Sequence, residues 1–152
     1  MPSKPKNICV AITGASGALG SAIATRLAEM GAHVLLHANA GAAKVNALAD
    51  VLKAAGHSAE PVLFDITNDD ATAAAIADML KPGPVQIIVN NAGIHDDAVF
   101  PGMKAAQWHQ VIDVSLHGFF RVTQPLVLPM LRTRWGRILN ISSVAALAGN
   151  RG

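Results

Sequence analysis

Four groups of small or polar residues in this sequence have the types and spacing needed to hold a phosphate-bearing ligand. They are a turn rich in small residues over 13–20, then Asn39, Asp65, and the pair Asn90 and Asn91. Glycines let a backbone approach a phosphate closely, and free N–H groups at the start of a helix attract its negative charge. A glycine turn alone also fits an ordinary strand-to-helix connection. The elements that surround it must therefore decide between the two interpretations.

The apolar pattern around the turn predicts a strand, a helix and a second strand. Residues 8–12 form a short apolar run that is typical of a buried parallel strand. After the turn, apolar residues recur at helical spacing and indicate one helix face: Leu19, Ile23, Leu27 and Met30. Gly31 ends this helix, and residues 32–36 begin the second strand. A strand, glycine turn, helix and strand within about 30 residues favour a nucleotide-binding unit.

Strands and helices alternate along the rest of the chain. The second strand is predicted to run over residues 33–37, and three further strands over 61–65, 85–89 and 137–141. The further helices are predicted over 42–55, from an N-cap within 67–70 to residue 80, and over about 105–132. Pro125 and Pro129 each remove a helical hydrogen bond, so we expect the last helix to kink or to be shorter. A loop of small residues is expected after Ser143.

Five strands separated by helices predict an α/β fold, a Rossmann-type doubly wound parallel sheet. Because such crossovers are right-handed, the expected strand order is 3-2-1-4-5. Ligands of these sheets bind beyond the carboxyl ends of the strands, between the first and fourth strands. The turn over 13–20, Asn39, Asp65 and the pair at 90–91 all fall at this edge. Their recurrence there favours a nucleotide site over a generic α/β domain.

Composition excludes several other classes of protein. The 152 residues suffice for one domain or part of one, and half of them are apolar while only 14% are charged. The net charge of +2 comes from scattered basic residues, so no nucleic-acid partner is expected. Residues 1–6 are expected to be a flexible tail without the apolar core of a signal peptide. No run reaches about 18 apolar residues, so we expect a cytoplasmic protein without a membrane partner.

The cysteine and the histidines do not indicate a metal site. A single cysteine, Cys9, excludes an intrachain disulfide and is expected to be a small core residue. His33 and His37 lie four residues apart on a predicted strand, which is no metal-ligand spacing. His95, His109 and His117 are expected on loop and helix surfaces.

Four motifs resemble the short-chain dehydrogenase/reductase family in order and spacing: residues 13–20, Asp65, residues 90–93 and residues 140–143. The chain is most like the 3-oxoacyl-acyl carrier protein reductases within it, through residues 136–143 and 149–152. The resemblance covers the chain from Asn7 onward. It implies an NAD(P)H-dependent carbonyl reductase that transfers hydride to a ketone, with 3-oxoacyl-acyl carrier protein reduction in fatty-acid synthesis as the expected reaction.

The resemblance also implies roles for individual residues. Contacts to the adenosine phosphate and pyrophosphate would come from Gly14, Ala15, Ser16, Gly17, Ala18, Leu19 and Gly20. Asn39 would lie beside the adenosine ribose, Asp65 and Ile66 beside the adenine, and Asn91, Ala92 and Gly93 on the nicotinamide side. Ser143 would be the catalytic serine, and Ser115 occupies the usual position of a catalytic asparagine. The alternatives are a helix or turn cap for Ser143, a solvated strand-end carboxylate for Asp65 and a turn-former for Asn91.

The expected cofactor is NADP, because no carboxylate follows the second strand at residues 37–39 to repel a 2′-phosphate. NAD stays an alternative, since no arginine stands there to bind that phosphate. The substrate is expected to be a small molecule or an acyl group on a carrier protein. The resemblance further implies a homo-oligomer for the full-length protein, with the apolar segment over 114–120 partly uncovered. For Phe119 and Phe120 the alternative is core packing.

Three departures separate the chain from the family pattern. Ala18 replaces the usual middle glycine, with Gly17 directly before it, and Ser115 replaces the asparagine. The family's Tyr-x-x-x-Lys is absent, and the sequence contains no tyrosine. We therefore expect residues 7–152 to be the N-terminal dinucleotide-binding part of a single Rossmann-fold domain in a longer reductase, apparently truncated after the fifth strand. The alternative is a non-catalytic nucleotide-binding module or a subunit completed by another chain.

Overall fold

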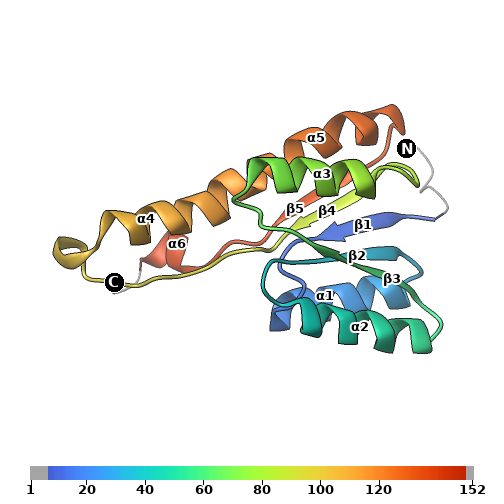
Figure 1. The fold of residues 1–152 in the computed structure, drawn as a ribbon, viewed down its shortest axis with the longest axis horizontal. Helices are drawn as coiled ribbons and strands as arrows, with labels where there is room; N and C mark the ends of the chain where they lie inside the picture. The colour runs from blue at the N-terminus through green and yellow to red at the C-terminus, as the bar shows by residue number, and fades with distance from the viewer. Residues whose placement is uncertain (1–6, 150–152) are drawn as a thin grey trace.

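A computed structural model describes residues 7–149 and contains a five-stranded parallel sheet between helices (Figure 1). The strands are β1 (Cys9–Ile12), β2 (His33–Ala38), β3 (Ser58–Leu63), β4 (Ile87–Asn90) and β5 (Arg137–Asn140). Their order is β3-β2-β1-β4-β5, and every neighbouring pair is parallel. The predicted strand order is thus confirmed. The tail expected over 1–6 and the end of the 149–152 segment lie outside the described residues.

Helices cover both faces of the sheet. Helices α1 (Ala18–Glu29) and α2 (Ala42–Ala54) lie on one face, and α3 (Asp69–Met79) and α5 (Gly118–Arg132) lie on the other (Figure 1). Successive residues of a strand alternate between the faces, so Val10 and Ile12 join the core under α1 and α2 while Ala11 joins the core under α3 and α5. The doubly wound arrangement is confirmed. None of the described helices is long and apolar enough to span a membrane.

The buried face of α1 agrees only in part with the predicted one, because Ile23 and Leu27 are half-buried and pack against the core. Its fully buried residues are the small ones spaced by four, Gly20, Ala24 and Ala28. Leu19 and Met30, predicted to face the core, are 53% and 58% exposed. Small residues let the helix lie close to the sheet, which leaves the larger side chains at its flanks.

The long helix predicted over 105–132 is interrupted, but not at its prolines. Helix α4 (Ala105–Ile112) and α5 are joined by η2 (Asp113–His117), a five-residue π-helical segment. Pro125 and Pro129 lie inside α5, which continues to Arg132, so the two prolines do not shorten the helix. The buried side chains of α5, among them Val122 and Leu126, pack on the sheet and hold the helix despite the two missing hydrogen bonds.

Several smaller boundaries also differ from the prediction. Strand β3 begins at Ser58 rather than Pro61 and ends at Leu63, before Asp65; as an edge strand it accommodates the proline. Strand β4 begins at Ile87 rather than at residue 85. The loop expected after Ser143 contains the short helix α6 (Ala145–Ala148), and η1 (Phe100–Gly102) is a single 3-10 turn.

The expectation of an uncovered apolar segment over 114–120 is confirmed in part. Leu116 is 57% and Phe120 63% exposed, whereas Phe119 is half-buried. His95, His109 and His117 are exposed, as expected.

Candidate nucleotide-binding site

The turn between β1 and α1 has the backbone geometry that its glycines allow. Gly14 has a φ of +67°, in the left-handed region, and a Cβ there would lie 3.0 Å from Cα of Ala92. The residue before α1, Gly17, is extended and offers no side-chain cap. The first N–H groups of α1, at Ala18, Leu19 and Gly20, therefore have no acceptor in their own helix. They are the donors that this turn presents to a ligand.

Two amides of the turn are already engaged by His37 at the end of β2. The N–H of Gly14 donates to Nδ1 of His37 at 3.1 Å, and the N–H of Ala15 donates to the His37 carbonyl oxygen at 2.8 Å. The Gly17 N–H donates to the Gly14 carbonyl oxygen at 3.2 Å. The N–H groups of Gly14, Ala15 and Gly17 are therefore used in bonds that shape the turn. Sequence reasoning missed this role of His37, because the bonds join residues 22 and 23 positions apart.

Asn91 and Thr13 hold the turn between β1 and α1 in place through side-chain hydrogen bonds. The side-chain amide of Asn91 donates to the carbonyl oxygens of Thr13 at 3.0 Å and Gly14 at 3.1 Å. The hydroxyl oxygen of Thr13 accepts the N–H groups of Asn91 at 3.0 Å and Ala92 at 2.9 Å. The side-chain amide of Asn91 thus acts as a support of the turn. The sequence analysis did not predict that Thr13 supports the turn. The only feature that could have indicated this role is a hydroxyl at the end of a buried strand.

Asn39 and Asp65 come together beyond the ends of β2 and β3. The Asp65 carboxylate accepts the N–H of Thr67 at 2.9 Å and its hydroxyl at 2.7 Å. These bonds, together with one from the Asn39 side chain, hold the pKa of Asp65 below its usual range. Ile66, the next residue, is buried, and a Cβ at Gly118 of α5 would lie 2.9 Å from the Ile66 side chain. A cavity of about 570 Å³ opens here, lined by residues that include Asn39, Asp65 and Asp113.

The two candidate catalytic serines lie on separate elements. Ser115 is exposed in η2, and its Oγ lies 3.9 Å from where a Cβ on Gly93 would stand. Ser143 is exposed after β5, and its Oγ accepts the N–H of Ala145 at 3.1 Å. In residues 7–149 no hydrogen bond joins the two serines. In this structure Ser143 caps the turn that leads into α6, which is the alternative interpretation stated above.

A charged network ties η2 to α3 beside the cavity. Arg121 of α5 binds Asp69 at the start of α3 and Asp113 of η2, the latter at 2.7 Å. Asp113 also meets His117 at 3.1 Å, and the guanidinium and imidazole hold the pKa of Asp113 below its usual range. The pKa of Arg121 is raised by the same contact. The sequence analysis did not predict this network. The feature that could have indicated it is the spacing of four residues from Asp113 to His117 and from His117 to Arg121.

Asn90 links β4 to its neighbours without contacting the turn. Its buried side-chain amide donates to Thr123 of α5 at 3.0 Å and to Asn140 of β5 at 2.9 Å. The described part of the chain holds no group of three His, Cys, Asp or Glu residues that could bind a metal ion.

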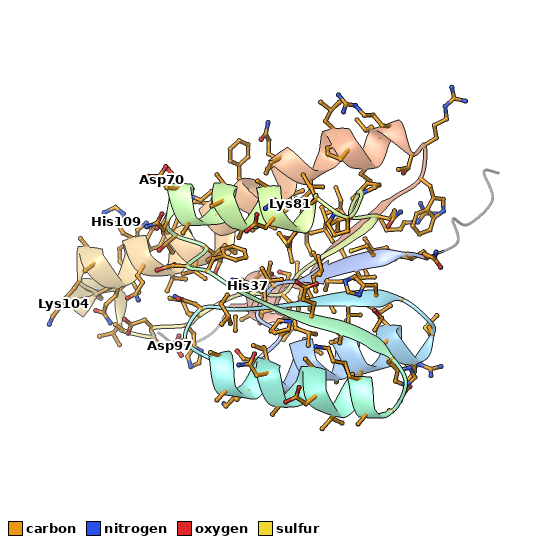
Figure 2. All side chains as sticks on the ribbon, turned by 45° about the vertical axis from the view of Figure 1, so that its right-hand side comes forward. His37, Asp70, Lys81, Asp97, Lys104 and His109 are labelled. Atoms are coloured by element: carbon orange, nitrogen blue, oxygen red, sulfur yellow. The ribbon has the colours of Figure 1, made fainter. Side chains whose placement is uncertain are left out.

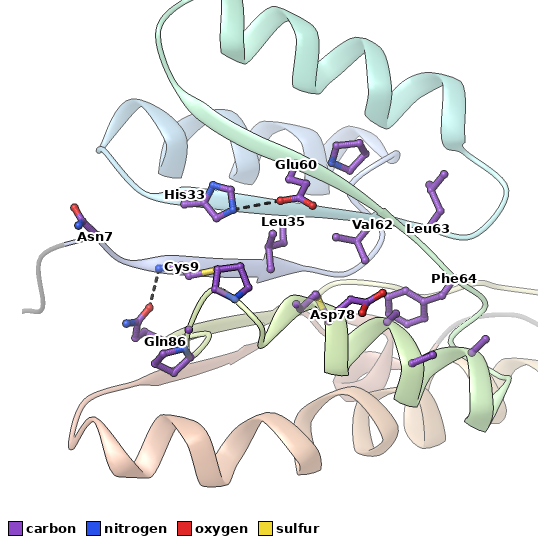
Figure 3. Close-up of a pocket in the computed structure, with 18 residues that line it drawn as sticks. Asn7, Cys9, His33, Leu35, Glu60, Val62, Leu63, Phe64, Asp78 and Gln86 are labelled. Carbon is purple, nitrogen blue, oxygen red and sulfur yellow. Dashed lines mark hydrogen bonds and ion pairs between the residues drawn. The ribbon is translucent and has the colours of Figure 1, made fainter.

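A second cavity, of about 650 Å³, lies between the sheet and α3, away from the predicted site residues (Figure 3). Cys9, His33 and Glu60 line it. Cys9 is only partly buried there, so its prediction as a core residue holds in part: it packs at the edge of the core. Burial, and then the negative charge of Glu60, raise the pKa of the Cys9 thiol to about 11.

Comparison with known proteins gives consistent matches over nearly the whole chain. The family described as short chain dehydrogenase matches residues 8–152. The chain is 36% identical over 145 residues to the 3-oxoacyl-acyl-carrier-protein reductase of Aggregatibacter actinomycetemcomitans, covering 94% of this chain and 60% of that protein. It is 35% identical over 142 residues to the reductase of the same name from Pseudomonas aeruginosa, covering 93% and 57%. It is 40% identical over 145 residues to nodulation protein G of a Rhizobium species, covering 93% and 56%. The chain thus spans less than two thirds of each of these relatives.

Proposed function

The chain belongs to the short-chain dehydrogenase family, and from this premise we propose that it binds a nicotinamide dinucleotide at the carboxyl edge of β1, β2 and β4. One observation carries the proposal: the turn after β1 lets its backbone and a ligand approach each other closely. A Cβ at Gly20 would lie 2.4 Å from the Gly14 carbonyl oxygen, and the helix that follows starts without a side-chain cap. Uncapped N–H groups beside a turn of small residues suit a pyrophosphate.

The rest of the cofactor would follow the residues that line this edge. Ser16 and the first amides of α1 would hold the pyrophosphate. The adenosine would extend past Asn39 into the cavity beside Asp65, while the Ile66 side chain is buried against Gly118 of α5. The nicotinamide side would run along Ala92 and Gly93, since the Asn91 amide is engaged by the turn.

NADP is the favoured cofactor, with NAD as the alternative. The first turn of α2 carries no acidic residue, and neither do residues 37–41 before it. The starts of α1 and α2 also lie side by side, because a Cβ at Gly41 would lie 2.5 Å from Cβ of Ser16. A 2′-phosphate placed there would meet two helix N-termini, and residues 37–41 and the first turn of α2 contribute no carboxylate.

Binding of the oxidised cofactors by calorimetry tests this choice. NADP⁺ is expected to bind more tightly than NAD⁺. The variant Asn39→Asp places a carboxylate where the 2′-phosphate would lie and is expected to weaken NADP⁺ roughly tenfold or more relative to NAD⁺. Asn46→Asp, on the exposed side of α2, introduces the same charge away from the site and serves as the matched control. Equal losses in the two variants would contradict the proposed orientation.

We further propose that the whole protein reduces a ketone, with 3-oxoacyl groups on a carrier protein as the substrate class and a homo-oligomer as its assembly. The names of two relatives, both 3-oxoacyl-acyl-carrier-protein reductases, support this substrate. The bound cofactor would supply the hydride. The Ser143 hydroxyl would donate to the substrate oxygen as negative charge develops there, and Ser115 would orient groups beside Gly93. Reduction also needs a proton donor, and the sequence contains no tyrosine, the donor that the family resemblance implies.

The Ser143 contact to Ala145, in which the hydroxyl oxygen caps a turn, favours a second candidate: a nucleotide-binding module or subunit without activity of its own. Measuring NADPH oxidation with a 3-oxoacyl thioester separates the two candidates. Turnover that is lost in Ser143→Ala would support the reductase. Cofactor binding without turnover would support the module, and absence of binding would contradict both.

A further inference from the structure

We infer that His37 is a positioning residue of this site, which as a neutral imidazole joins the glycine turn after β1 to the segment after β3 and makes cofactor affinity dependent on pH. The inference rests on the proposed cofactor site. It concerns a residue that contacts no expected part of the cofactor and that acts through Gly14 and Phe64.

His37 makes contacts on both sides of its ring. Its Nδ1 accepts the N–H of Gly14 at 3.1 Å, and its Nε2 lies 3.1 Å from the carbonyl oxygen of Phe64. The Phe64 ring packs against the imidazole, with the ring centres 4.2 Å apart. His37 is 5% exposed and lies near the end of β2, where Figure 2 labels it. One buried side chain thus links the proposed pyrophosphate and adenine regions.

The partners of the ring allow only one protonation state. A backbone N–H only donates, so Nδ1 must be unprotonated to accept from Gly14. A carbonyl oxygen only accepts, so Nε2 must carry the hydrogen that it donates to Phe64. A second proton on Nδ1 would face the Gly14 N–H and break that bond. Since Gly14 is the left-handed residue of the turn, its displacement would alter the positions of the amides that follow it.

The surroundings of His37 keep it neutral near pH 7. Burial lowers its pKa below the usual value, while the Phe64 carbonyl and the Asp65 carboxylate oppose this shift more weakly. Asp65 is the charged group that faces the ring from the segment after β3, and the turn after β1 contributes no titratable side chain. Protonation therefore occurs only as the pH falls below the normal histidine range, and the turn is disrupted there.

Cofactor binding across pH tests the inference, with NADP⁺ as the probe. In the wild-type chain the dissociation constant is expected to rise as the pH falls, approaching about tenfold per pH unit below the pKa of His37. His37→Asn offers an amide oxygen to Gly14 but does not titrate. Its profile should therefore lack this rise and show only the titration of the ligand's own phosphate. Matching profiles for the two proteins would overturn the inference.

A second measurement needs neither a variant nor a cofactor. Nitrogen-15 NMR of the histidine rings reports which nitrogen carries the hydrogen. We expect the Nε2–H form for His37, and a Gly14 amide signal that shifts with the same pH midpoint as the ring. An Nδ1–H form, or a Gly14 signal insensitive to that midpoint, would overturn the inference. If NADP⁺ fails to bind at every pH while these signals appear, the positioning role stands and the proposed cofactor site fails.

Discussion

Gly20 of α1 lies directly against Gly14 of the turn: a Cβ on Gly20 would stand 2.4 Å from the Gly14 carbonyl oxygen. The same Cβ would lie 2.8 Å from the side-chain nitrogen of Asn91, which itself donates to that carbonyl. Helix, turn and the segment after β4 therefore meet with no space for a methyl group. The stability of the domain depends on this point of closest approach.

The variant Gly20→Ala is expected to lower the free energy of unfolding by about 1–3 kcal/mol, because backbone must shift to admit the methyl group. Urea denaturation measures the change. Gly17→Ala is the matched control, since its Cβ would have only the Gly14 carbonyl nearby, at 3.5 Å. Equal destabilisation by the two alanines would show that helix packing at Gly20 is not tight.

Thr13 offers a test of the support beneath the turn. Thr13→Val keeps the shape of this buried side chain but leaves the N–H groups of Asn91 and Ala92 without their acceptor. We expect a loss of about 1–3 kcal/mol in the free energy of unfolding, measured by urea denaturation. Thr13→Ser retains the hydroxyl and should cost less. A serine variant less stable than the valine variant would mean that the methyl group, not the hydroxyl, dominates.

The lowered pKa of Asp65 predicts how the free energy of unfolding changes at acid pH. Its pKa in the folded protein is below the ordinary 3.8, so its contribution to stability is complete above about pH 4 and is lost as the pH falls through the folded value. Asp65→Asn should therefore flatten part of the fall in stability below about pH 4, measured by thermal melting at several pH values. Asp50→Asn, on the exposed surface of α2, is the control. An unchanged acid profile in Asp65→Asn would contradict the expectation.

Cys9 predicts slow alkylation in the folded protein. Its thiol pKa of about 11 leaves the reactive thiolate roughly a hundredfold rarer near pH 8 than in a free cysteine. Iodoacetamide labelling followed by mass spectrometry measures the rate on the one cysteine of the sequence. Labelling in urea should be faster by a similar factor. Equal rates with and without urea would mean that Cys9 is not protected by the fold.

The sequence predicts the sheet well because each strand depends on local composition. The apolar runs around Val10, Val34 and Ile88 identify buried parallel strands whatever surrounds them, and right-handed crossovers then fix their order. Strand β3 was predicted less well, since Ser58 and Glu60 lie at an exposed edge where polar residues are accepted. The π-helical segment η2 has the same composition as a regular helix. The spacing of apolar residues along the sequence does not reveal it, so it was not predicted.

The sequence predicted which residues lie near the candidate site better than it predicted which atoms those residues contact. Asn39 and Asp65 meet as expected, because carboxyl ends of neighbouring parallel strands share one edge. The roles of His37 and Thr13 could not be predicted, because each depends on bonds to backbone groups far away in the sequence. Only the folded sheet brings those groups within reach.

The strand order also sets the sequence of events during folding. The first strand pairs with two partners, so that Val10 lies beside both Val34 and Ile87. The pairing with Val34 closes a short loop, whereas the pairing with Ile87 must wait for a much longer segment to return. Strands β1 to β3 can thus assemble while one side of β1 is still open. Because Asn91 follows β4, the glycine turn acquires its support only when β4 pairs with β1.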